Sequence, residues 1–222
     1  MRALPPAPRR RYHRAMRWTL PNILTVLRLL AAPGVAVMFL YFNRPWADWF
    51  ALVLFLGAAV TDWFDGYLAR SWKQESRFGA MLDPIADKAM VVIALLVIVG
   101  YSSMSPWLVL PATFIVFREV FVSGLREFLG ADARLLAVTK LAKWKTTAQM
   151  VAIAVLFLQD VFLHHLLNRG GGLVADDGWL AWGHDVTGNL GLALLWVAAA
   201  LTVVTGWDYF RKALPYLKDA PR

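Results

Sequence analysis

Long uninterrupted stretches of apolar residues are the feature of this sequence that most restricts its fold. The first runs from Leu20 to Phe42 and exceeds the roughly 20 residues that an α-helix needs to cross about 30 Å of hydrocarbon. Hydropathy places six predicted spans near residues 20–42, 47–69, 84–101, 106–128, 142–165 and 189–212. We therefore predict an all-α, polytopic membrane protein with six transmembrane helices.

Composition supports a membrane protein and excludes several kinds of site. Of the 222 residues, 59% are hydrophobic and only 17% are charged, which is far from the mixture of a soluble domain. There is no cysteine, so disulfides and thiolate metal sites are excluded and any metal must use oxygen or histidine ligands. The net charge of +8 favours anionic lipid headgroups as partners, because the basic residues are not interleaved with aromatics on a soluble face as nucleic-acid binding requires.

The N-terminal run RRRYHRAMR, followed by apolar residues, could imitate a signal peptide. The apolar core of a signal peptide is usually about 7 to 15 residues long, however, and the stretch that begins at Leu20 is longer. We therefore predict a retained first transmembrane helix. The predicted organisation is a basic cytosolic segment at 1–19 and one membrane domain at 20–215.

Basic residues predict which helix ends face the cytosol, because cytoplasmic loops collect Lys and Arg. An even number of spans places both termini on one side. That side carries six N-terminal Arg and most of the other basic residues, namely Arg70, Lys73, Arg77, Arg134, Lys140, Arg211, Lys212, Lys218 and Arg222. The opposite side has little beyond Arg44 and Arg169, together with a Gly-rich, acidic segment at 168–188. We predict a multipass protein of the cell inner membrane with both termini in the cytosol.

Four aspartates, Asp62, Asp65, Asp83 and Asp87, lie at the predicted cytosolic ends of two successive spans. Each would cost about 2.5 to 3.5 kcal/mol if it faced lipid, so they must face a polar interior. Their spacings of three and four residues put each pair on one helical face. Four converging carboxylates require a counter-charge, and Mg²⁺ or Mn²⁺ accepts hard oxygen ligands. The segment therefore predicts a metal site.

Small residues beside these acids leave room for a substrate. Gly66 follows Asp65, and Ala69 lies roughly one turn beyond it on the same face. Pro84 fits the first position of a helix, which makes Asp83 a predicted N-cap. The simpler alternative is that the acids only neutralise nearby cations around a solvated loop, namely Arg70, Lys73, Arg77 and Lys88. A solvated loop does not require helical spacing on both of its sides.

The complete pattern is Asp62-x2-Asp65-Gly66-x2-Ala69-Arg70-x8-Gly79-x3-Asp83-x3-Asp87. It resembles the signature of the CDP-alcohol phosphatidyltransferase family at every position. The resemblance implies six helices and two Mg²⁺ or Mn²⁺ ions held by Asp62, Asp65, Asp83 and Asp87, with Asp87 also acting as the base. It further implies a site for CDP-diacylglycerol, facing the cytosol, and a homodimer.

The resemblance also assigns residues to the CDP-lipid. These are Asn22, Thr25, Arg28, Asp62, Gly66, Ala69, Arg70, Ser76, Gly79 and Asp83. The first three resemble the family's first-helix stretch that borders the nucleotide. The alternative for that stretch is an N-cap followed by an arginine that snorkels to the headgroups.

The acceptor is predicted from the fourth and fifth spans. Arg118 lies in the apolar run FREVFVSGLREFLG, where an arginine needs an anion or an acid as its partner. This text and the following KLAKWKTTAQ resemble the phosphatidylglycerophosphate-forming members of the family, although Ala142 stands where relatives often have Gly, and segment 168–188 looks longer than usual. The implied acceptor is sn-glycerol 3-phosphate, with its phosphate bound by Arg118, Lys143 and Lys145.

Three alternatives to this acceptor assignment stay open. The lysines can instead contact anionic lipid. The same chemistry can use phosphatidylglycerol, serine or an inositol phosphate as the acceptor. A metal-ion transporter would also explain paired intramembrane acids, but it leaves Gly66, Arg70 and Gly79 unexplained at their spacing.

Overall fold

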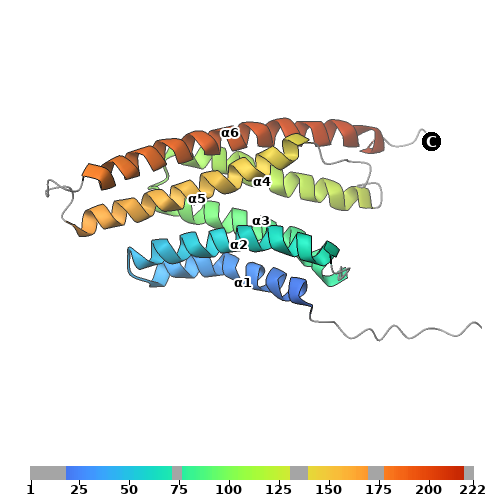
Figure 1. The fold of residues 1–222 in the computed structure, drawn as a ribbon. Coiled ribbons are helices and arrows are strands. Elements are labelled where there is room, and N and C mark those ends of the chain that lie inside the picture. The colour runs from blue at the N-terminus through green and yellow to red at the C-terminus, as the bar shows by residue number, and fades with distance from the viewer. Residues whose placement is uncertain (1–18, 72–76, 131–139, 170–177, 218–222) are drawn as a thin grey trace, which may run out of the picture.

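The computed structural model in Figure 1 describes residues 19–71, 77–130, 140–169 and 178–217. Its helices are α1 (Leu20–Tyr41), α2 (Trp46–Ser71), α3 (Arg77–Tyr101), α4 (Pro106–Leu129), α5 (Lys140–Asn168) and α6 (Gly178–Leu217). These residues form helices and no strand, so the predicted all-α fold is confirmed for the described part of the chain.

Four of these helices are long and apolar enough to cross a membrane. The qualifying segments are Asn22–Tyr41, Pro106–Leu129, Trp144–Asn168 and Gly178–Tyr216, and Trp46–Thr61 is a shorter apolar helix. The chain is therefore a multipass membrane protein. The exact number of crossings and the cytosolic position of the termini stay predictions.

Successive helices run in opposite directions along one bundle (Figure 1). The start of α1 and the end of α6 consequently lie at the same end of the bundle. Helix α1 packs against α2 and α3, α6 packs against α4 and α5, and α3 contacts both α4 and α5. The central position of α3 matters for function because α3 carries Asp83 and Asp87 between the two groups of helices.

Small residues allow these helices to approach closely, as is usual in membrane bundles. Ala94 of α3, Ala152 of α5 and Ala198 of α6 are completely buried. A Cβ atom added at Gly191 of α6 would lie 2.8 Å from the side chain of Leu156 on α5. The Leu156 side chain therefore packs directly against the backbone of α6 at this point.

Charged residues are also buried at the end of the bundle opposite the start of α1. Asp48 of α2 is fully buried and accepts a hydrogen bond from Arg44. The Nδ1 atom of His164 on α5 lies 3.1 Å from the Asp48 carboxylate. Because an unpaired buried charge is costly, this cluster compensates Asp48 while it joins α2 to α5.

Two predicted helix boundaries are wrong. Helix α3 begins at Arg77, so Pro84 lies inside the helix and Asp83 is not its N-cap. A proline inside a helix lacks the N–H that donates to the carbonyl four residues earlier, but the surrounding residues keep α3 helical across it.

The second error concerns the segment at 168–188, because α6 already begins at Gly178. The segment has no long apolar run, so hydropathy did not detect this helix. The first turns of α6 are instead stabilised by packing on α5. The rings of Phe162 on α5 and Trp179 on α6 lie 6.3 Å apart, and Gly183 of α6 is buried.

Candidate active site

The four predicted acids lie on two successive antiparallel helices. Asp62 and Asp65 belong to the C-terminal half of α2, and Asp83 and Asp87 belong to the first turns of α3. These parts of the two helices lie at the end of the bundle where α1 begins and α6 ends (Figure 1). The helical spacing predicted for both pairs is therefore confirmed, and both pairs are carried to the same end of the molecule.

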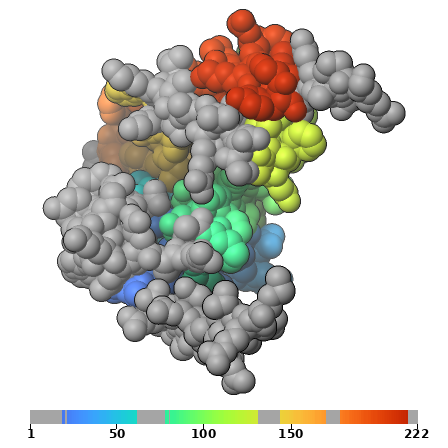
Figure 2. Space-filling model, turned by 90° about the vertical axis from the view of Figure 1, so that its right-hand side faces the viewer, coloured from blue at the N-terminus to red at the C-terminus, as the bar shows by residue number. Residues whose placement is uncertain are grey.

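Figure 2 views the molecule from that end. Parts of α1, α3, α4 and α6 reach the surface there, between residues drawn in grey. The first helix, the acid-bearing helix α3, helix α4 with the predicted acceptor residue Arg118, and α6 therefore reach one face of the protein.

Helix α1 presents a buried polar face to this site. Asn22, Thr25 and Arg28 recur every three residues, and each is at most 3% exposed. The Thr25 hydroxyl donates a hydrogen bond of 2.7 Å to the Oδ1 atom of Asp83. The Arg28 guanidinium donates a hydrogen bond of 3.3 Å to the Oδ1 atom of Asp87.

These contacts exclude the simpler alternative for the stretch on α1. The N-cap of α1 is Thr19, whereas Asn22 lies inside the helix and is buried. Arg28 does not snorkel, because it points into the bundle and pairs with an acid on α3. Asp87 keeps 52% of its side chain exposed in spite of this pair, so one of its faces is open to a ligand.

Part of the predicted donor site lies outside the described residues. Ser76 is not described, and α2 is described only as a helix between 62 and 71, without its side chains. Gly79 is buried in the first turn of α3. Among the side chains that are described, no three His, Asp or Glu side chains converge as a metal site. A metal set that includes Asp62 and Asp65 stays a prediction, and four carboxylates would suit Mg²⁺ or Mn²⁺.

A cationic pocket of about 210 Å³ lies among α3, α4, α5 and α6. It is smaller than the roughly 300 to 1,000 Å³ of pockets that hold drug-sized ligands. Its lining includes four cations, Lys88, Arg118, Arg126 and Lys145, and one carboxylate, Glu119. Four cations against one carboxylate leave a formal charge of +3, which suits a small anionic ligand.

Glu119 holds two of these cations in place. Its Oε1 atom accepts a hydrogen bond from Lys145 of α5 and a second one, of 3.1 Å, from the Nη1 atom of Arg118. Lys145 is only 4% exposed and shares a helical face with Gln149, which is also buried. The acid partner that the sequence required for Arg118 is therefore the adjacent glutamate, and it serves Lys145 as well.

Lys88 connects the pocket to the acid-bearing helix. Its Nζ atom donates a hydrogen bond to the Ser123 hydroxyl of α4, which in turn donates to the carbonyl oxygen of Glu119. Lys88 directly follows Asp87 in α3. The pocket residue Lys88 and the predicted base therefore occupy consecutive positions of α3.

The sequence model of the CDP-alcohol phosphatidyltransferase family matches residues 18–204. This range includes both pairs of acids and the four cations of the pocket. The chain belongs to this family.

Two curated relatives of this CDP-alcohol phosphatidyltransferase are named CDP-diacylglycerol–glycerol-3-phosphate 3-phosphatidyltransferase. The protein of that name from Cereibacter sphaeroides is 67% identical over 227 aligned positions, which cover 92% of this chain and 99% of the relative. The protein of that name from Escherichia coli strain K12 is 37% identical. The alignment covers 92% of this chain and 100% of the relative. Similarity therefore extends along nearly the whole chain.

The pocket residues of this CDP-alcohol phosphatidyltransferase that were not predicted to bind a ligand include Lys88, Arg126 and Tyr209. Lys88 had been considered only as a counter-ion of the acids, and Tyr209 lies far along the chain in α6. The positions of Arg118 and Arg126, eight residues apart on one helix, are a signal that could have identified Arg126, because about two helical turns place both on the same face. The side chain of Lys143 lies outside the described residues.

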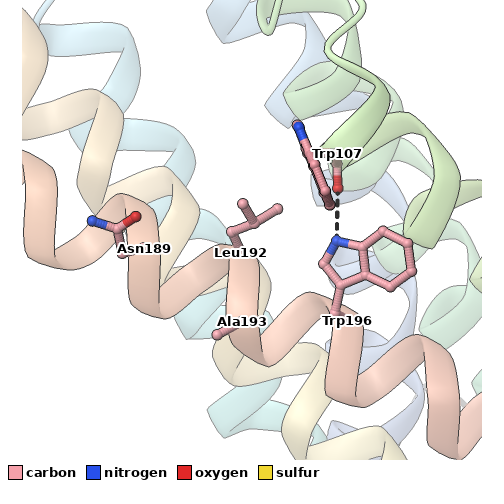
Figure 3. Close-up of a pocket in the computed structure, with 5 residues that line it drawn as sticks. All are labelled: Trp107, Asn189, Leu192, Ala193 and Trp196. Atoms are coloured by element: carbon pink, nitrogen blue, oxygen red, sulfur yellow. Dashed lines mark hydrogen bonds between the residues drawn. The ribbon is translucent and has the colours of Figure 1, made fainter.

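A second pocket, of about 340 Å³, lies between the first turn of α4 and the middle of α6 (Figure 3). Its lining includes Trp107, Leu192 and Trp196, and the indole N–H of Trp196 donates a hydrogen bond of 3.1 Å to the carbonyl oxygen of Trp107. Its described lining has no charged side chain, so it suits a phosphate less well than the cationic pocket does.

Proposed function

We propose that this protein transfers the phosphatidyl group of CDP-diacylglycerol to sn-glycerol 3-phosphate, with phosphatidylglycerophosphate and CMP as products. The observation that carries the proposal is the small cationic pocket, whose lining residue Lys88 directly follows Asp87 in α3. The names of the 67% and 37% identical relatives contain the same two substrates.

The acceptor phosphate binds to Arg118, Lys143 and Lys145. Support for this assignment comes from Arg118 and Lys145, which both line the pocket and share Glu119 as a counter-ion. A phosphate monoester is a stronger ligand than one carboxylate oxygen for these two cations, because it offers more acceptor oxygens and up to two negative charges. Lys88 and Arg126 add positive charge to the same pocket.

The donor binds at the acid-bearing helix ends. Asp62, Asp65, Asp83 and Asp87 are the proposed ligands of two Mg²⁺ or Mn²⁺ ions, which when bound neutralise the pyrophosphate and stabilise an in-line displacement. The residues proposed to hold the CDP-lipid are Asn22, Thr25, Arg28, Asp62, Gly66, Ala69, Arg70, Ser76, Gly79 and Asp83. The buried polar face of α1 supports the first three of them.

The residues of the chain then act on the acceptor hydroxyl. With its phosphate held in the cationic pocket, the acceptor places this hydroxyl toward Asp87, which accepts the proton. The hydroxyl oxygen forms a bond to the phosphorus that carries diacylglycerol. The bond from that phosphorus to the bridging oxygen breaks, and CMP leaves with that oxygen.

The exposure of Asp87 supports its role as the base. Half of its side chain is open, although Arg28 contacts one carboxylate oxygen. Thr25 restricts the neighbouring Asp83 through its hydrogen bond, so α1 orients both acids.

The proposed setting is the inner membrane, with six crossings, a basic cytosolic segment at 1–19 and a membrane domain at 20–215. Both termini and the active site face the cytosol, where the acceptor and CMP are soluble. The common position of the start of α1, the end of α6 and the acid-bearing helix ends supports this orientation. A homodimer is proposed from the family alone.

One assay tests this function. Purified protein receives CDP-diacylglycerol, Mg²⁺ and one candidate alcohol at a time, and CMP and the lipid product are identified by mass spectrometry. The candidates are sn-glycerol 3-phosphate, phosphatidylglycerol, serine and inositol phosphate. We expect phosphatidylglycerophosphate with the first alcohol only, and loss of CMP release after chelation of the metal. Release of CMP with a different alcohol alone would overturn the acceptor assignment, and no CMP with any alcohol would overturn the reaction.

A further inference from the structure

Tyr209 connects α6 to the cationic pocket, although no step of the proposed reaction uses it. It lines the pocket and is only 2% exposed. Its ring packs with Val122, Leu125 and Leu129 of α4 and with Ala213 of α6. A tyrosine placed this deeply among apolar side chains needs a partner for its hydroxyl.

Two arginines of α4 contact this tyrosine. Arg126 donates a hydrogen bond of 3.1 Å from its Nη2 atom to the Tyr209 hydroxyl, and its Cζ atom lies 5.2 Å from the ring centroid. The Cζ atom of Arg118 lies 5.6 Å from the same centroid. Both distances are within the roughly 6 Å over which a guanidinium is attracted to an aromatic ring.

Gly206, three residues before Tyr209, provides the space for Arg118. A Cβ atom added at this glycine would lie 3.1 Å from the Cγ atom of Arg118. Any larger residue would therefore push the arginine stem away from α6. Gly206 and Tyr209 lie on the same face of α6, about one turn apart. Together they determine the position of the Arg118 side chain.

The chemistry of the tyrosine suits an anion site. Two neighbouring guanidinium groups repel each other, and a carboxylate between them would relieve the repulsion but cancel positive charge. An aromatic ring attracts both groups without adding a negative charge. The Nε atom of Arg118 is buried and has no hydrogen-bond partner in the described part of the chain, so the described contacts leave this donor unused.

We propose that Tyr209 and Gly206 are positioning residues that hold Arg118 and Arg126 toward the phosphate of the acceptor. The inference rests on the proposed function for the identity of that acceptor. Helix α6 thereby controls acceptor affinity.

The test compares Tyr209→Phe and Tyr209→Leu with the matched control Tyr216→Leu, whose tyrosine lies on the same helix but is 47% exposed. For each variant, KM is measured for sn-glycerol 3-phosphate and for CDP-diacylglycerol, and thermal unfolding is recorded in detergent. We expect Tyr209→Leu to raise the acceptor KM about tenfold and the CDP-lipid KM less than about twofold. Tyr209→Phe, which keeps the ring, should give a smaller rise, and the control should give none.

Equal changes in both KM values, or a lower unfolding temperature with unchanged KM values, would overturn the proposal, since a merely structural tyrosine affects both substrates alike. A further measurement separates this failure from failure of the proposed function. Inorganic phosphate is titrated against the thermal unfolding of the wild type and of Tyr209→Leu, without any turnover. Weaker stabilisation of the variant supports the positioning role whichever alcohol reacts, and equal stabilisation contradicts it.

Discussion

The hydroxyl of Thr25 on α1 donates a hydrogen bond of 2.7 Å to the carboxylate of Asp83 on α3. The two residues are 58 positions apart in the chain, and Thr25 is almost fully buried. A hydrogen bond from a buried neighbour restricts the orientation of a carboxylate, as partners of metal ligands commonly do. The first helix therefore takes part in the acid site as well as in bundle packing.

Thr25→Val should weaken binding of the metal, because the side chain keeps its shape but loses the donor to Asp83. Loss of such a partner commonly lowers metal affinity by roughly 10- to 100-fold. The Mg²⁺ concentration that gives half-maximal CMP release measures the effect. Thr25→Ser keeps the hydroxyl and is the matched control. The same Mg²⁺ requirement in both variants would show that Asp83 does not need this hydrogen bond.

Asp87→Asn should abolish turnover while nucleotide binding stays measurable. The amide keeps the size of the side chain but cannot accept the proton of the acceptor hydroxyl. CMP release and CDP binding are measured on the same preparation. Asp208→Asn on α6, where the acid contacts Lys212 near the surface, is the control. Turnover of Asp87→Asn near the wild-type rate would exclude this residue as the base.

Arg118→Ala should raise the KM for the acceptor far more than the KM for CDP-diacylglycerol. The variant removes a charge-assisted donor from the cationic pocket, a change on the order of 2 kcal/mol or about 30-fold in affinity. Steady-state kinetics with each substrate varied in turn measure both constants. Arg211→Ala, an exposed arginine of α6, controls for loss of positive charge at this end of the protein. An equal loss for both substrates would contradict the assignment of Arg118.

Glu119→Gln should lower the free energy of unfolding. Lys145 is 4% exposed and would lose its only carboxylate partner among the described residues, and breaking a buried ion pair on one side costs roughly 3 kcal/mol. Thermal unfolding in detergent measures the change. Glu127→Gln, on the exposed end of the same helix, is the matched control. If both variants unfold at the wild-type temperature, Glu119 is not needed to compensate Lys145.

Local patterns predicted the helices that carry the proposed donor site. The spacing of three residues between Asp62 and Asp65 and of four between Asp83 and Asp87 defines one face of each helix wherever the helix lies. Apolar length predicted membrane helices, because the thickness of the bilayer sets a minimum number of residues. Both features depend only on residues close together in the chain, and the structure confirms the helices that carry them.

Helix boundaries that depend on packing were harder to predict from the sequence. Pro84 was placed at a helix start from its own preference, but α3 begins at Arg77. The start of α6 at Gly178 depends on contacts with α5 rather than on its own hydropathy. In both cases tertiary contacts outweighed a local signal.

The sequence by itself determined the chemical class of the protein: an all-helical membrane enzyme of the CDP-alcohol phosphatidyltransferase family with paired acids on two helices. Only the tertiary structure decided how the cationic pocket is built. Lys88, Arg126 and Tyr209 lie on three different helices, and no periodicity relates them. Their convergence results from the packing of α3, α4 and α6, because side chains distant in sequence can share one pocket only after the helices have assembled.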